Sequence, residues 1–98
     1  MGADVIVTPR TTGTSSHRWK TAGAMAAITA GAYFISSNRA GVAKHGQEFG
    51  GGGFAISPEG NILGETTPDA PLIVTTVDLR VSRDQKKSYP CYVQELRI

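Results

Sequence analysis

Apolar and β-branched residues gather in five short runs that are separated by polar or glycine-rich stretches. In the first run, Asp4–Thr8, the apolar residues are consecutive rather than alternating, which predicts a strand buried on both faces. The run Leu72–Leu79 gives the strongest strand pattern in the chain. The other predicted strands are Ala32–Ser37, Phe54–Ser57 and Ile62–Glu65.

One long segment, His17–Ala30, has helical periodicity. Ser15 or Ser16 can begin this helix, because a hydroxyl accepts a hydrogen bond from an unpaired first-turn N–H group. Gly31 suits the end, where a residue with left-handed backbone is favoured. Small side chains along one helical face predict close packing on a sheet; that face carries Trp19, Ala22, Gly23, Ala26, Ala27 and Ala30.

The remaining elements are short. The segment Pro58–Asn61 predicts a tight turn that joins its neighbouring strands into a β-hairpin. Val42–Glu48 is interpreted as a polar loop, Arg80–Lys87 as a short helical turn and Ser88–Ile98 as a tail. The predicted order is therefore β-α-β-β-β-β with one main helix, an α+β fold of the α/β type.

Length and composition limit the class of protein. The chain has 98 residues, of which 40% are hydrophobic and 18% charged, as in one small globular domain rather than a disordered tail. No apolar run approaches the roughly 20 residues that span a bilayer, and the start of the chain does not resemble a signal peptide. A chain this short buries a marginal core, so we expect a homo-oligomer or a missing partner segment.

Charge and cysteine usage exclude further classes. A formal net charge of +2, with its basic residues scattered, does not indicate a nucleic-acid partner. One cysteine gives neither a disulfide framework nor a cysteine-based zinc site, which favours the cytoplasm. His17 and His45 are too far apart in sequence to indicate a metal site.

Two features invite a chemical interpretation but favour a structural one. The run Gly50–Gly53 has no following Lys and no helix, as a phosphate-binding P-loop requires, so it predicts a close backbone approach instead. Cys91 lies in a Tyr-Pro-Cys-Tyr context without a helix start or base that would activate a thiol. We interpret it as an inert thiol.

The polar segment that follows the first strand is the strongest candidate for a site. Arg10 and Thr11 lie between a strand end and the helix start, where α/β folds bind ligands. An anion or a carbonyl oxygen is one interpretation, and an ordinary capped loop is the other. The sequence leaves both open.

The order of short motifs resembles the carbon–nitrogen hydrolase (nitrilase) superfamily. The resemblance rests on the Gly-Ala-Asp strand at the start, the tryptophan helix, a strand ending in Asn-Arg-x-Gly, a Phe-Gly-Gly segment, an Ile-x-Pro-x-Gly turn, a Val-x-x-Asp-Leu strand and a Tyr-Pro tail. In this sequence they begin at Gly2, Trp19, Asn38, Phe49, Ile56, Val74 or Val77, and Tyr89. The resemblance covers essentially the whole chain.

The resemblance implies that residues 1–98 form a single partial domain, the C-terminal half of an α-β-β-α sandwich. Such enzymes hydrolyse non-peptide C–N bonds through a Cys, a Glu and a Lys, without metal or organic cofactor. All three positions would precede Met1, so the chain supplies no catalytic residue and is expected to be inactive alone. It would supply a pocket wall formed by Arg10, Thr11 and Asn38.

Two alternatives from other classes stay open. The chain can be a self-associating structural module, because exposed strand edges are templates for pairing. It can also be a module that binds a small carboxylate at the Arg10 loop. The expected partners are therefore a second copy or a missing N-terminal half, with a small-molecule ligand and without nucleic acid or membrane.

Overall fold

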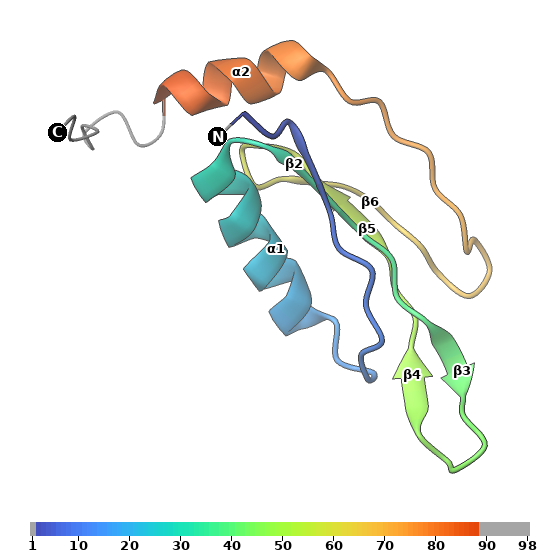
Figure 1. Cartoon of the computed structure of the whole chain (residues 1–98). Coiled ribbons are helices and arrows are strands. Elements are labelled where there is room, and N and C mark those ends of the chain that lie inside the picture. Colours follow the sequence, from blue (N-terminus) through green and yellow to red (C-terminus); the bar gives the residue numbers. More distant parts are fainter. Residues whose placement is uncertain (1, 89–98) are drawn as a thin grey trace, which may run out of the picture.

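A four-stranded sheet with a helix on one face organises the computed structural model, which describes residues 2–88 (Figure 1). The strands are β1 (Val5–Val7), β2 (Tyr33–Ser36), β5 (Phe54–Ile56) and β6 (Ile62–Glu65), in the order β1-β2-β5-β6. β1 and β2 are parallel, whereas β2, β5 and β6 follow one another antiparallel. The predicted α+β class is confirmed.

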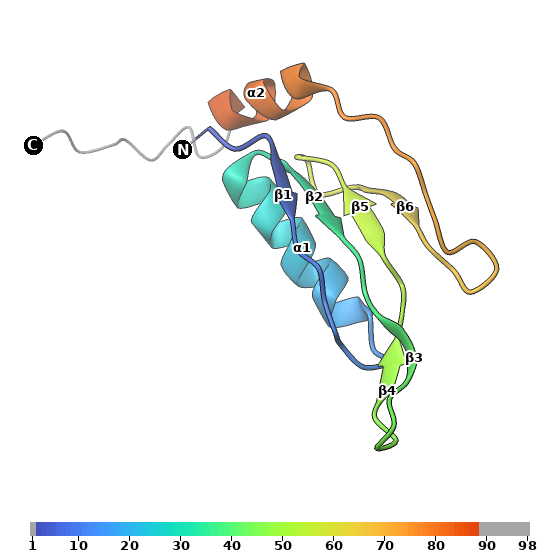
Figure 2. The same cartoon turned by 45° about the vertical axis from the view of Figure 1, so that its right-hand side comes forward.

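Helix α1 (His17–Ala30) connects the two parallel strands and covers one face of the sheet (Figure 2). Its bounds match the predicted segment. The core between helix and sheet is nearly solvent-free, with Ala27 and Ile56 at 0% exposure and Phe54 at 1%. The rings of Phe34 and Phe54 stack with centroids 6.2 Å apart. A Cβ on Gly23 would lie 2.9 Å from the Phe34 ring, so the helix approaches the sheet through Gly23 and Ala27 as predicted. Trp19 and Ala22, which were predicted on the same face, are exposed, so the buried face is narrower than predicted.

The two ends of α1 are built differently from each other. Ser16 is the N-cap residue, but its hydroxyl makes no capping bond, so that part of the prediction is wrong. Its carbonyl oxygen accepts from the Trp19 and Lys20 N–H groups instead. Gly31 ends the helix with φ 61°, as predicted, and its N–H group donates back to the last turn.

Strand β1 differs from its predicted burial on both faces. Ile6 packs against the core under α1, but Val5 is 37% and Val7 68% exposed. The reason is that neighbouring residues of a strand point to opposite faces, and α1 covers only one of them. We call the face opposite α1 the second face.

The predicted strand Leu72–Leu79 is not formed. Residues 72–78 have no secondary structure, and helix α2 (Leu79–Ser88) begins at Leu79. A strand is defined by its backbone partners, and within residues 2–88 this segment has none. α2 confirms the helical turn predicted at Arg80–Lys87 and extends it, so the fold has two helices rather than one main helix.

Of the two hairpins, one was predicted. β5 and β6 form the expected antiparallel pair, and the Ser57 N–H group closes their turn by donating to Asn61 O at 2.8 Å. The second hairpin joins β3 (Ala40–Val42) to β4 (Glu48–Gly50) and projects from the body of the molecule (Figure 1). The loop prediction for Val42–Glu48 is therefore wrong at its ends. Glycine and polar residues gave these strands no apolar pattern.

The glycine run confirms the predicted close backbone approach. A Cβ on Gly50 would lie 2.5 Å from Gly13 O, and one on Gly53 would lie 3.0 Å from Ser36 O. Gly51 and Gly52 have φ of 65° and 76°, which residues with a Cβ rarely adopt. Cys91 and the Tyr-Pro tail lie outside the described residues.

Candidate functional site

The polar loops that follow β1 and β2 meet at one edge of the sheet. Because these strands are parallel, both carboxyl ends lie at this edge. Arg10 and Asn38 form an isolated parallel bridge there. The Arg10 N–H group donates to Ser37 O at 2.8 Å, and the Arg39 N–H group donates to Arg10 O at 3.2 Å. The fold therefore brings together two residues that are distant in sequence.

The Arg10 guanidinium ties three segments of chain together. Its Nε donates to Ser36 Oγ at 2.6 Å, and its terminal nitrogens donate to Thr12 Oγ1 at 3.2 Å and to Gly52 O at 2.6 Å. The guanidinium carbon also lies 4.9 Å from the centre of the Phe54 ring. The Ser36 hydroxyl in turn donates a hydrogen bond to Thr8 O at 2.6 Å. Arg10 thus fixes the loop after β1 against the core.

All of these acceptors are neutral oxygens. No carboxylate among residues 2–88 lies within ion-pair distance of Arg10. Partial burial lowers the pKa of Arg10, because leaving water disfavours the charged form, although an arginine remains protonated at neutral pH. The local charge at this edge is therefore positive.

Asn38 holds the same loop from the other side. Its Oδ1 accepts from the Thr12 N–H group at 2.8 Å, and its Nδ2 donates to Thr12 O at 3.2 Å and to Gly51 O at 2.8 Å. A single side-chain amide thereby satisfies both backbone groups of Thr12. Asn38 and Arg10 together give the loop one defined position.

A hollow of about 340 Å³ lies against the fixed loop. It is open to solvent, and hydroxyl groups dominate its polar lining. Its walls are Thr12, Gly13, Thr14, Ser15, Arg18 and Trp19. This lining can hold a small polar molecule by hydrogen bonds, but it contains no nucleophile with an adjacent base.

The three predicted wall residues have different positions. Arg10 and Asn38 lie together at this edge, with their side chains engaged in the protein, whereas Thr11 is exposed. Their contact with a substrate stays a prediction. Sequence reasoning missed Ser36 and Gly52 as partners of Arg10; a serine at the end of an apolar strand was the available signal.

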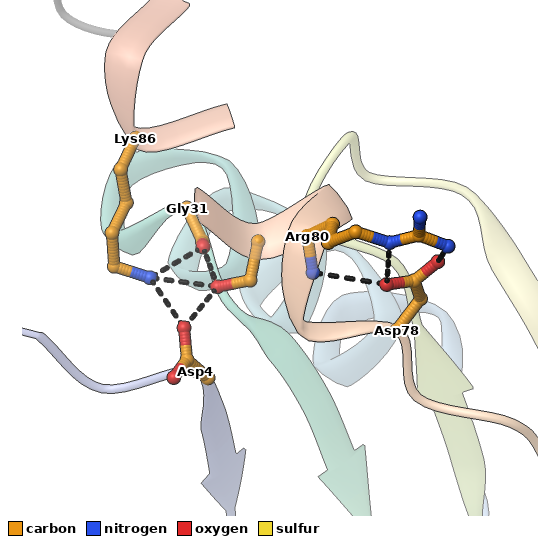
Figure 3. Close-up of polar contacts among 6 residues, drawn as sticks. Asp4, Gly31, Asp78, Arg80 and Lys86 are labelled. Atoms are coloured by element: carbon orange, nitrogen blue, oxygen red, sulfur yellow. Dashed lines mark hydrogen bonds and ion pairs between the residues drawn. The ribbon is translucent and has the colours of Figure 1, made fainter. Parts of the chain in front are cut away.

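A second polar cluster joins α2 to the sheet, and sequence reasoning missed it. Lys86 Nζ lies 2.8 Å from Gly31 O, 2.7 Å from Ser82 Oγ and 3.5 Å from Asp4 Oδ1 (Figure 3). Ser82 Oγ is buried, 2.9 Å from Asp4 Oδ1 and 2.6 Å from Gly31 O. The hydrogen bond with Ser82, supported by Lys86 and by Arg83, holds the pKa of Asp4 below its ordinary value.

Neither cluster resembles a metal site. Within residues 2–88, no three His, Cys, Asp or Glu side chains lie close enough together to hold a metal ion. In the same part of the chain, no helix has the length and apolar character needed to cross a membrane.

Comparisons with known proteins agree with this architecture. The family model described as carbon-nitrogen hydrolase matches residues 1–87. The crystal structure of a carbon-nitrogen hydrolase from Helicobacter pylori G27 matches 91% of this chain and 36% of its own, with 20% identity and a TM-score of 0.76. XC1258 from Xanthomonas campestris is a CN-hydrolase superfamily protein with an arsenic adduct in its active site. It matches 97% of this chain and 37% of its own, with 17% identity and a TM-score of 0.79. No curated protein matches the sequence significantly.

The sheet, α1 and their connections are thus part of the carbon–nitrogen hydrolase fold. Because the family model covers most of its length, the chain belongs to the carbon–nitrogen hydrolase family. It spans a little over a third of the length of the solved structures that it matches.

Proposed function

We propose that this chain forms the carboxyl-terminal part of a domain that hydrolyses non-peptide C–N bonds in small amides, nitriles or carbamoyl compounds. The observation that carries the proposal is the family match over residues 1–87, in a chain that covers 36% and 37% of two solved relatives. In this proposal the catalytic Cys, Glu and Lys lie outside residues 2–88. The chain alone is inactive.

The contribution of the described residues is a wall of the pocket. Arg10 and Asn38 fix the loop after β1, and Thr11 is exposed on that loop. Three hydrogen bonds through the Arg10 side chain and three through the Asn38 side chain fix the position of the loop. A fixed loop is what the orientation of a substrate requires. Thr11 and the hydroxyl groups beside it are then available to a bound molecule.

The chemistry proposed for the whole domain is covalent. A thiolate attacks the carbon of the substrate. From an amide or a carbamoyl compound the amine or ammonia then leaves, whereas a nitrile first gives a thioimidate, which one water converts to the thioester with release of ammonia. A further water then releases the acyl group from the thioester. This route needs neither a metal nor an organic cofactor. The chain's single cysteine fits a reducing compartment, so we place the protein in the cytoplasm.

The first test concerns the chain alone. The purified chain is assayed on simple amides, nitriles and N-carbamoyl compounds beside its Cys91→Ser variant, and neither is expected to turn over. Hydrolysis by both proteins would contradict the proposed inactivity. Hydrolysis by the parent alone would make Cys91 the nucleophile, contrary to the proposal.

The second test supplies the rest of the fold. Residues 2–87 replace the matched part of the Helicobacter pylori protein, and the chimera is assayed on whichever of these substrate classes its parent hydrolyses. A cooperatively folded, active chimera is expected. A folded chimera without activity would show that residues 2–87 do not form a working pocket wall.

A further inference from the structure

The hollow beside the fixed loop is built from one continuous segment. Its lining residues all lie within Thr12–Trp19, which joins the loop after β1 to the first turn of α1. Asn38 binds both backbone groups of Thr12, and the Gly50 N–H group also donates to Thr12 O, at 3.2 Å. A Cβ on Gly50 would lie 2.6 Å from Thr14 Cα, so β4 closes tightly on the same segment. The described residues therefore fix the shape of the hollow by themselves.

The chain around the hollow has a surplus of positive charge. No Asp or Glu occurs between Asp4 and Glu48, and we call residues 5–47 the acid-free segment. Its basic side chains are Arg10, Arg18, Lys20, Arg39 and Lys44. Among residues 2–88, Lys20 is the one member of this set that forms an ion pair, with Glu65. A surface where one sign of charge dominates attracts ligands of the opposite sign, so this edge of the sheet favours an anion.

Two donor groups bring this charge into the hollow. The Arg18 side chain is exposed and lines the hollow, and no carboxylate in the described part of the chain lies within ion-pair distance of it. The Thr12 hydroxyl accepts a hydrogen bond from the Arg10 guanidinium at 3.2 Å, and its own proton has no acceptor within residues 2–88. A carboxylate can accept from both a guanidinium and a hydroxyl group.

Trp19 adds an apolar surface beside these donors. Its side chain also lines the hollow, and the residue is 37% exposed. A site that combines an aromatic ring with one charged group suits a ligand that has a short hydrocarbon part and one charged end.

We propose that the hollow binds the carboxylate of a small molecule, with Arg18 paired to that carboxylate and Trp19 against its hydrocarbon part. Arg18 is the one charged side chain among the lining residues, so a single carboxylate balances its charge. The inference rests on the proposed function for the fate of the ligand, since the compound hydrolysed by the complete domain then carries a carboxylate besides its C–N bond. Binding itself needs no catalytic residue and is tested on the chain alone.

Fluorescence reads this site directly, because Trp19 is the only tryptophan of the chain. The purified chain is titrated at neutral pH and constant ionic strength with butyrate, and separately with butyramide, which has nearly the same shape but no charge. Butyrate should change the emission saturably at millimolar concentrations, and butyramide should bind at least about 10-fold more weakly. Inorganic phosphate, which has no hydrocarbon part for Trp19, should also bind more weakly than butyrate.

Two variants separate a site from a general electrostatic attraction. Arg18→Gln and Lys44→Gln each remove one positive charge from an exposed position of the acid-free segment, but Lys44 lies on the projecting hairpin, outside the lining of the hollow. Arg18→Gln should weaken butyrate binding by about 5- to 10-fold, and Lys44→Gln by less than about 2-fold.

Four results would overturn the proposal. They are the lack of a saturable response to butyrate, equal binding of butyrate and butyramide, tighter binding of phosphate than of butyrate, and equal weakening in the two variants. None of these results depends on turnover, so the failure of this proposal is distinguishable from the failure of the proposed hydrolysis, which the chimera tests.

Discussion

Replacing Lys86 by Met tests whether α2 is attached to the sheet mainly through one amine. Methionine keeps most of the aliphatic stem but removes the contacts of Nζ with Gly31 O at 2.8 Å and with Ser82 Oγ at 2.7 Å. The single proton of Ser82 can be donated to only one acceptor at a time. With Lys86 bound to Gly31 O, that proton is free for Asp4. Without Lys86, Ser82 cannot satisfy both.

The size of the effect follows from what is left unpaired. Gly31 and Ser82 are buried, so water cannot replace a lost hydrogen-bond partner there without a cost in free energy. Asp4, in contrast, can turn toward solvent. A hydrogen bond from a charged donor contributes about 1.5–3 kcal/mol, and the amine is itself partly exposed, so we expect Lys86→Met to lower the free energy of docking α2 by about 1–2 kcal/mol. Amide exchange across Leu79–Ser88 should accelerate about 5- to 30-fold.

Lys87→Met is the matched control, because it removes the same charge from the neighbouring exposed position. Exchange in α2 should change little in that variant. Hydrogen exchange measured by mass spectrometry or NMR, at neutral pH and on both variants, decides the matter. Equal acceleration in the two variants would show that α2 is held by general charge rather than by the contacts of Lys86.

Three further predictions concern the sheet and its loops. Arg10→Met should lower the free energy of unfolding in urea by about 2–3 kcal/mol, whereas Arg39→Met, at the exposed residue before β3, should lower it by less than about 1 kcal/mol; equal effects would refute the role of the Arg10 contacts. Gly23→Val should destabilise by about 1–3 kcal/mol more than Ala22→Val on the exposed side of α1, because its branched side chain would overlap the buried rings. Because the pKa of Asp4 is lowered on folding, its carboxylate stabilises the fold fully at pH values above the ordinary pKa of 3.8, and this stabilisation is lost as pH falls through the lowered pKa. Asp4→Asn should therefore flatten the pH dependence of amide protection in α2 below about pH 4. An unchanged profile would contradict this.

Elements with a strong local signal could be predicted from the sequence. The bounds of α1 followed from the small residues on one face and from Gly31, and the β5–β6 hairpin followed from its Pro-x-Gly-Asn turn. These signals act within a few residues, so they do not depend on the rest of the fold. The glycine run also predicted close approach, although not which backbone it approaches.

Elements that depend on distant partners could not be predicted. Residues 72–77 have the composition of a strand, but pairing depends on a second strand, which residues 2–88 do not supply. At the candidate site, the resemblance to the family assigned Arg10 and Asn38 to one pocket wall. It did not show that the Arg10 side chain turns inward to Ser36 and Gly52, because those contacts join positions 26 and 42 residues away.

The extended segment at residues 72–77 also bears on where the rest of the domain docks. α1 already covers the first face with a solvent-free core, so any further part of a carbon–nitrogen hydrolase domain has to dock on the second face or at an edge. If that part pairs with residues 72–77, amide exchange in these residues should be slower in the folded Helicobacter pylori chimera than in the isolated chain. Exchange at the same rate in both proteins would show that the added part docks elsewhere.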